Sequence, residues 1–70
     1  MHKYNIRFHK GTPAESECIL EVSCNAASDI PACMYRDVLE KELKEKLDFD
    51  FTICVRDGFL PQDLVSEKRC

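Results

Sequence analysis

The chain has 70 residues, with 13 acidic side chains, ten Lys and Arg, a formal net charge of −3 and five cysteines. An apolar fraction of 44% beside a charged fraction of 33% is typical of a folded globular chain and excludes intrinsic disorder. A second core would fall below the size at which chains fold unaided. We therefore expect one small domain over residues 1–70.

The N-terminal segment has no apolar stretch of the kind found in secretory signals. No run of the chain approaches the roughly 20 apolar residues of a membrane-spanning helix. An odd number of cysteines argues against a closed disulfide framework. These features predict a cytoplasmic protein with reduced thiols.

Two alternating segments open the chain. In residues 3–10, Tyr4, Ile6 and Phe8 share one parity, which predicts a half-buried strand. After a turn over 11–16, residues 17–24 alternate again and predict a second strand that forms a hairpin with the first. The inward side chains of this second strand are expected to be Cys18, Leu20, Val22 and Cys24.

A helix is predicted from about residue 29 to residue 47. Ser28 or Asp29 can cap its start, and Pro31 fits the first turn, where a missing N–H costs little. Charged pairs four residues apart indicate a solvated face. The opposite face carries an apolar stripe of Tyr35, Leu39, Leu43 and Leu47, with Ala32 and Val38 at its margins.

Residues 48–56 alternate most clearly and predict a third strand. Phe49, Phe51, Ile53 and Val55 are expected to face inward, and Cys54 outward, with Thr52 and Arg56. The tail, 59–70, is predicted to be docked or partly mobile, either as a short helix starting at Pro61 or as a loose arm.

These elements predict an α+β fold. One long helix covers one face of a three-stranded sheet, giving a two-layer ββαβ sandwich with a C-terminal tail. Lys3 and Arg7 make the outward face of the first strand basic, whereas the other two strands are acidic. Opposite charges meet across both pairings if the first strand is central, which favours the order 2-1-3.

Catalytic and metal-binding patterns are weak in this sequence. There is no C-x-x-C pair, phosphate loop or nucleophile elbow, so we expect no metal, no other cofactor and no enzyme activity. Asp48 and Asp50 lie about 7 Å apart along an open sheet face and are interpreted as solubilising charges. The remaining thiol hypothesis names Cys33, near the helix start, and the terminal Cys70 as reactive.

Nucleic-acid binding is disfavoured, because the aromatic side chains fall at inward or tail positions and the net charge is negative. A short basic N-terminal stretch keeps a weak nucleic-acid binder as an alternative.

The sequence therefore favours a small non-catalytic accessory domain that binds a protein partner by contact, with a homodimer as a further expectation. Phages and other mobile elements carry inhibitors of this general build. A thiol-based redox or metal-responsive module that uses Cys33, Cys54 or Cys70 is the first alternative. The binding hypothesis rests on acidic and apolar side chains of the strands and tail: Glu17, Ile19, Glu21, Asp48, Asp50, Phe59, Leu60 and Leu64.

Overall fold

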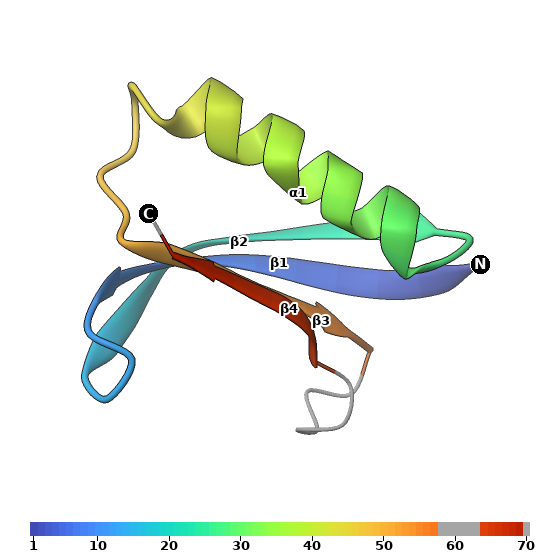
Figure 1. Cartoon of the computed structure of the whole chain (residues 1–70), viewed down its shortest axis with the longest axis horizontal. Helices are drawn as coiled ribbons and strands as arrows, with labels where there is room; N and C mark the ends of the chain where they lie inside the picture. Colours follow the sequence, from blue (N-terminus) through green and yellow to red (C-terminus); the bar gives the residue numbers. More distant parts are fainter. Residues whose placement is uncertain (58–63, 70) are drawn as a thin grey trace.

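A computed structural model describes residues 1–57 and 64–69 of the chain. Its elements are β1 (His2–Gly11), β2 (Ser16–Ala26), α1 (Asp29–Leu43), β3 (Phe51–Arg56) and β4 (Leu64–Arg69). The four strands form one antiparallel sheet in the order β2-β1-β3-β4, and α1 lies across one face of it (Figure 1). The protein is thus an α+β fold with one helix on an antiparallel sheet.

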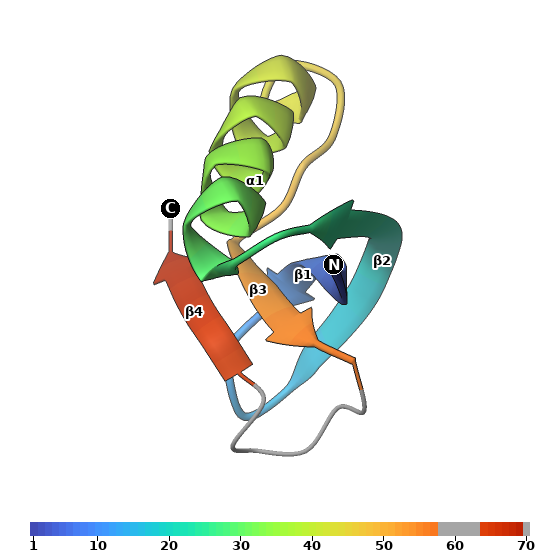
Figure 2. The same cartoon turned by 90° about the vertical axis from the view of Figure 1, so that its right-hand side faces the viewer.

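The sheet differs from the predicted one by a strand. The first three strands have the order 2-1-3, but residues 64–69 form β4 on the outer side of β3 rather than a short helix or a loose arm. Figure 2 shows β2 and β4 at opposite edges of the sheet. The local sequence conceals β4 because only its first two residues are apolar, so the strand depends on hydrogen bonding to β3.

The hairpin of β1 and β2 changes register once. Phe8 pairs with Leu20, but His9 pairs with Cys18, which leaves Ile19 as an extra residue in β2. Such a bulge reverses the parity of the strand beyond it. Cys18 was predicted to face inward; it is exposed instead, opposite His9. Gly11, with φ of 119°, begins the turn.

The core lies between α1 and the sheet. Three consecutive inward side chains of β1 (Tyr4, Ile6 and Phe8) are fully buried there, together with Ala32 from the helix and Cys54 from β3. The side chains packed around them are Leu20, Cys24, Leu39, Leu43, Leu47, Phe49 and Val65.

The helix is shorter than predicted and is rotated relative to the prediction. It ends at Leu43, and the Leu47 amide then donates to the Leu43 carbonyl oxygen at 2.7 Å, which keeps Leu47 against the core. Tyr35, predicted to be in the inward stripe, is 40% exposed, whereas Arg36 is buried. The reason is geometric: successive helical residues point about 100° apart, so a helix that buries Ala32 and Arg36 leaves Tyr35 at its side.

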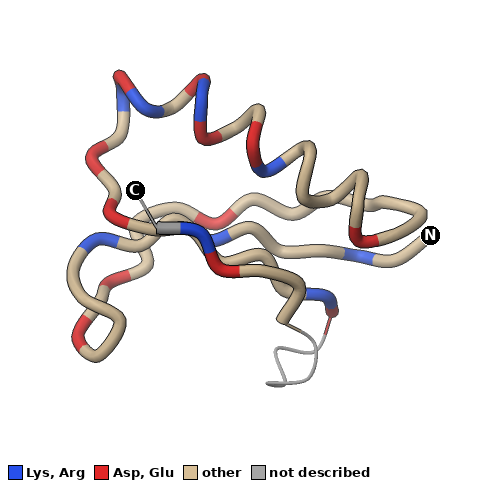
Figure 3. Tube along the Cα trace, in the orientation of Figure 1, with Lys and Arg blue, Asp and Glu red and all other residues tan. Residues whose placement is uncertain are grey.

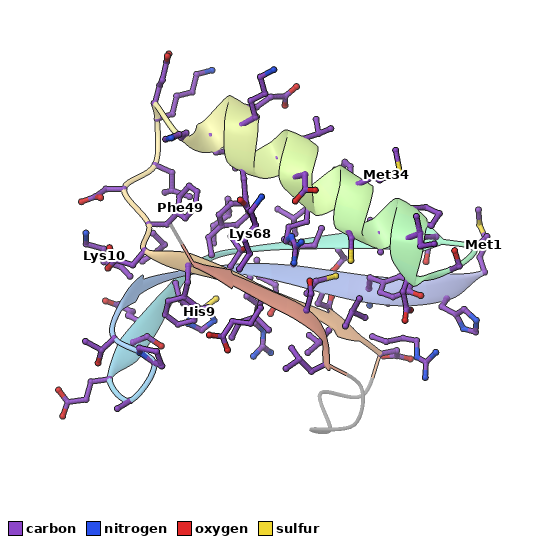
Figure 4. The ribbon with its side chains drawn as sticks, viewed as in Figure 1. Met1, His9, Lys10, Met34, Phe49 and Lys68 are labelled. Carbon is purple, nitrogen blue, oxygen red and sulfur yellow. The ribbon has the colours of Figure 1, made fainter. Side chains whose placement is uncertain are left out.

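The inward parity of β3 is the reverse of the prediction. Cys54 pairs with Ile6 and packs into the core, whereas Phe51 pairs with His9 and stacks on its ring at 5.0 Å, on the far face. The alternation breaks at a bend at Asp50, whose amide donates to the His9 carbonyl oxygen at 2.8 Å. Phe49, before the bend, still reaches the core and meets the Phe8 ring edge-on; Figure 4 shows Phe49 and His9 on opposite sides of the sheet.

Candidate functional site

The outward side of α1 carries a second apolar stripe. Ile30, Met34 and Val38 are 72%, 64% and 51% exposed, and we call these three residues the helix stripe. They recur every four residues, which places them on one side of the helix over two turns. The same spacing is present in the sequence. The sequence hides this stripe because the stronger pattern of Leu39, Leu43 and Leu47 predicts the inward face and puts Val38 at its margin.

The exposed apolar side chains of α1 all lie before Lys41. From Lys41 onward the exposed positions are charged, and Lys41, Glu42, Lys44 and Glu45 follow one another around the last turns. Figure 3 shows this change along α1, with the acidic and basic colours concentrated towards its C-terminal end. The helix therefore presents an apolar surface that ends in a mixed-charge segment.

A shallow groove lies beside the helix stripe, between the start of α1 and the end of β2. Its volume is about 440 Å³. Tyr35 and Pro31 form its helix side and Cys24 its strand side, and Met1, which is 93% exposed, stands at its margin. We call it the helix–strand groove; its lining is Met1, Cys24, Asn25, Ala26, Ala27, Pro31 and Tyr35.

The structure does not gather the predicted acidic residues into one open surface. Glu21 accepts a hydrogen bond from Nε of Arg7 at 2.7 Å across the hairpin. Lys10 Nζ lies 3.1 Å from an oxygen of Asp48 and 3.5 Å from one of Asp50. Asp50 also accepts a hydrogen bond from the Gly11 amide at 2.6 Å, and that bond, followed by the charge of Lys10, lowers the pKa of Asp50. Three of the four carboxylates therefore have partners within the chain.

The remaining predicted binding residues lie far apart on the sheet. Glu17 pairs in register with Lys10, and Ile19, at the bulge of β2, is 37% exposed. Leu64 is 45% exposed at the start of β4, on the opposite edge. Phe59 and Leu60 lie outside the described residues.

The described cysteines are Cys18, Cys24, Cys33 and Cys54, and all four are free thiols. Cys33 is half-buried in the second turn of α1, with its Sγ 3.8 Å from Oγ of Ser66. Cys54 is fully buried, and its pKa is raised to about 11, chiefly by burial and then by the nearby Cys33. Burial also raises the pKa of Cys24. The thiol predicted to be reactive at Cys70 lies outside the described residues.

A polar cluster unforeseen in the sequence lies between α1 and the β3–β4 edge. Arg36 donates to Ser66 and lies beside Glu40, which accepts a hydrogen bond from Oγ1 of Thr52 at 2.6 Å. Lys68 extends from β4 toward the helix and reaches Glu40 at 3.6 Å (Figure 4). The charged side chains of this cluster are largely paired with one another. The cluster therefore connects the helix to the sheet.

Within residues 1–57 and 64–69, no three His, Cys, Asp or Glu side chains gather closely enough to hold a metal ion. None of the helical segments in those ranges has the length and apolar character needed to cross a membrane. Comparisons with protein-family models, curated proteins and solved structures find no match to this chain.

Proposed function

We propose that this protein is a small non-catalytic binding protein that acts by contact with another protein through the helix stripe. The observation that carries the proposal is the exposure of Ile30, Met34 and Val38, between 51% and 72%, on consecutive turns of one helix. Apolar side chains grouped in this way on a small chain mark interaction surfaces more often than isolated exposed ones do.

The spacing of the stripe also suggests the chemistry of the partner. Apolar side chains four residues apart on an exposed helix match an apolar groove on another protein, the common helix-in-groove mode of recognition. The charged segment that begins at Lys41 would lie at the rim and fix the direction of the helix in that groove. Binding of this kind supports an accessory or inhibitory role, in which the chain covers a working surface of its partner.

The test uses the purified full chain as bait in an extract of its source cells, followed by titration calorimetry with the captured protein. Met34→Glu and Val38→Glu should each weaken binding at least tenfold, because each places a carboxylate in an apolar contact. Lys3→Gln is the matched control, since it makes the same change in net charge on the exposed far face of the sheet, and it should bind within about threefold of wild type. Unchanged binding by both stripe variants, or no captured protein at all, would contradict the proposal.

A thiol-based module is the second candidate, and the contact of Cys33 with Ser66 at 3.8 Å beside Arg36 is the observation that favours it. Labelling of native Cys33 by iodoacetamide at pH 7 at a rate well above that of exposed Cys18 would support this candidate. A labelling rate of Cys33 at or below that of Cys18 would reject the thiol-based candidate and leave binding by contact as the only proposed function.

A further inference from the structure

The strand β2 has an edge without a strand partner among the described residues. It is an outer strand of the sheet, 11 residues long, and its only charged side chains are Glu17 and Glu21. Exposed edge strands are usually protected by Lys, by Pro or by a short length. This strand contains neither Lys nor Pro, and its regular part follows the bulge at Ile19.

The inward side chains of that regular part are incompletely covered. Leu20, Val22 and Cys24 are half-buried on the helix side of the sheet, and Cys24 forms one wall of the helix–strand groove. A strand added beside β2 would extend the sheet and cover this apolar row at the same time. Its side chains would enter the groove against Tyr35.

The sequence of the strand is complementary to itself in one register. In an antiparallel pair of β2 strands related by a two-fold axis at Val22, each residue i faces residue 44 − i of the other copy. Leu20 then faces Cys24 of the other copy on the helix side, and Glu21 faces Ser23 on the far side. A shift that puts the axis at Glu21 places two carboxylates directly opposite each other, which is unfavourable.

We infer that a second copy of this chain occupies the β2 edge, centred on Val22, and that the two sheets join into one of eight strands. In this arrangement Leu20 of one copy enters the helix–strand groove of the other, beside Cys24 and Tyr35. The contact is isologous, so it closes at two copies and leaves the helix stripe of each copy open. Because only five residues of each β2 strand form the centre of the contact, the dimer interface is small. We therefore expect a dissociation constant on the order of 10–100 µM.

The register is tested by changing one side chain to either sign of charge. Ser23 is exposed, and among the described residues its hydroxyl donates to Asn5 Oδ1 alone, so Ser23→Lys and Ser23→Glu both remove this hydroxyl donor. In the dimer, position 23 of each copy faces Glu21 of the other, so there are two such pairs. Lys at position 23 gives two pairs of opposite charge, whereas Glu gives two pairs of like charge. Sedimentation equilibrium should show tighter association for Ser23→Lys and weaker association for Ser23→Glu, each by about two- to thirtyfold.

Matched control variants separate the effect of net charge from the effect of a charge at position 23. Glu45→Gln changes the net charge as Ser23→Lys does, and Lys44→Gln changes it as Ser23→Glu does, but both lie in the exposed turn that follows α1. Both should associate as wild type does. As a second measurement, alternate amides of Leu20–Cys24 should gain protection from hydrogen exchange as the protein concentration rises.

The inference would be overturned by a chain that stays monomeric up to about 1 mM, well above the expected dissociation constant. It would also be overturned by a dimer whose affinity ignores the sign of the charge at position 23. Neither result bears on partner binding by Met34 and Val38, so failure of this contact and failure of the helix stripe are distinguishable.

Discussion

Arg36 and Glu40 lie one turn apart on the sheet-facing side of α1, with Nε of the arginine 3.4 Å from Oε1 of the glutamate. Their side chains are only 8% and 12% exposed, an unusual degree of burial for two charged groups. Thr52 and Lys68 approach the glutamate from β3 and β4, and Ser66 accepts from the arginine. The pair therefore joins the helix to the two C-terminal strands of the sheet, β3 and β4.

Removing one member of this pair should be more harmful than removing both. Glu40→Leu leaves the buried guanidinium with only the exposed carboxylate of Asp37, 3.4 Å away, which costs up to about 3–5 kcal/mol in the free energy of unfolding. The double variant Arg36→Met/Glu40→Leu replaces the pair with apolar side chains and should recover most of that loss. Urea denaturation followed by circular dichroism measures both. A double variant no more stable than Glu40→Leu would contradict the importance of charge pairing.

Gly11 should not tolerate a side chain. Its φ of 119° is rare for other residues, and a Cβ there would lie 2.5 Å from the carbonyl oxygen of Glu15. We expect Gly11→Ala to lower the free energy of unfolding by roughly 1–3 kcal/mol. Thr12→Ser is the control, because it keeps the hydroxyl that accepts from the Glu15 amide. Equal thermal midpoints for Gly11→Ala and Thr12→Ser would refute the expectation.

His9 should make stability fall in mild acid. Burial, followed by the charge of Arg7, lowers its pKa below 6.5, and its Nε2 is buried with no hydrogen-bond partner among the described residues. The unfolded chain therefore takes up a proton before the folded one does, so stability is present above pH 6.5 and is lost as the pH falls through the folded pKa. His9→Phe keeps an aromatic ring on Phe51 and should flatten the dependence of the unfolding midpoint on pH just below 6.5. His2→Gln, exposed at the terminus, is the control and should keep the wild-type curve.

The Tyr4 hydroxyl should ionise at a much higher pH than that of an ordinary tyrosine. Its hydroxyl donates to Oδ1 of Asp29 at 2.7 Å, and this bond, followed by burial, raises its pKa from 10.0 to about 12. Its contribution to stability is present below pH 10 and declines as the pH rises toward 12. Ultraviolet titration at 295 nm should show a transition near pH 12 that Tyr4→Phe removes. Persistence of that transition in the variant would assign it to another group.

Cys54 should resist thiol reagents in the folded protein. Its pKa of about 11 leaves little thiolate at pH 8, and its side chain is fully buried. Cys18 is exposed on β2 and should react first with a disulfide reagent, as peptide mapping by mass spectrometry would show. Addition of 6 M guanidinium chloride should make the two thiols react at similar rates. Rapid labelling of native Cys54 would mean that the core opens readily.

The candidate site was only partly visible in the sequence. The spacing of Ile30, Met34 and Val38 could be read directly, but the choice between two apolar stripes on one helix depends on where the sheet lies. The acidic residues were predicted to lie on an open surface, whereas Arg7 pairs with Glu21 and Lys10 with Asp48 and Asp50. No sequence pattern shows which of these ion pairs form. The groove formed by Tyr35 and Cys24 joins residues of different elements and has no local signal.

The sequence by itself determined the type and order of the first four elements, because alternation in strands and four-residue spacing in the helix are local consequences of backbone geometry. It also determined the order of the first three strands, since opposite charges favour neighbours. Tertiary structure decided the rest. The bend at Asp50 and the bulge at Ile19 reverse which side chains face the helix, and both depend on hydrogen bonds and pairing with distant residues. The strand β4 forms because β3 offers it a free edge, which its own six residues do not reveal.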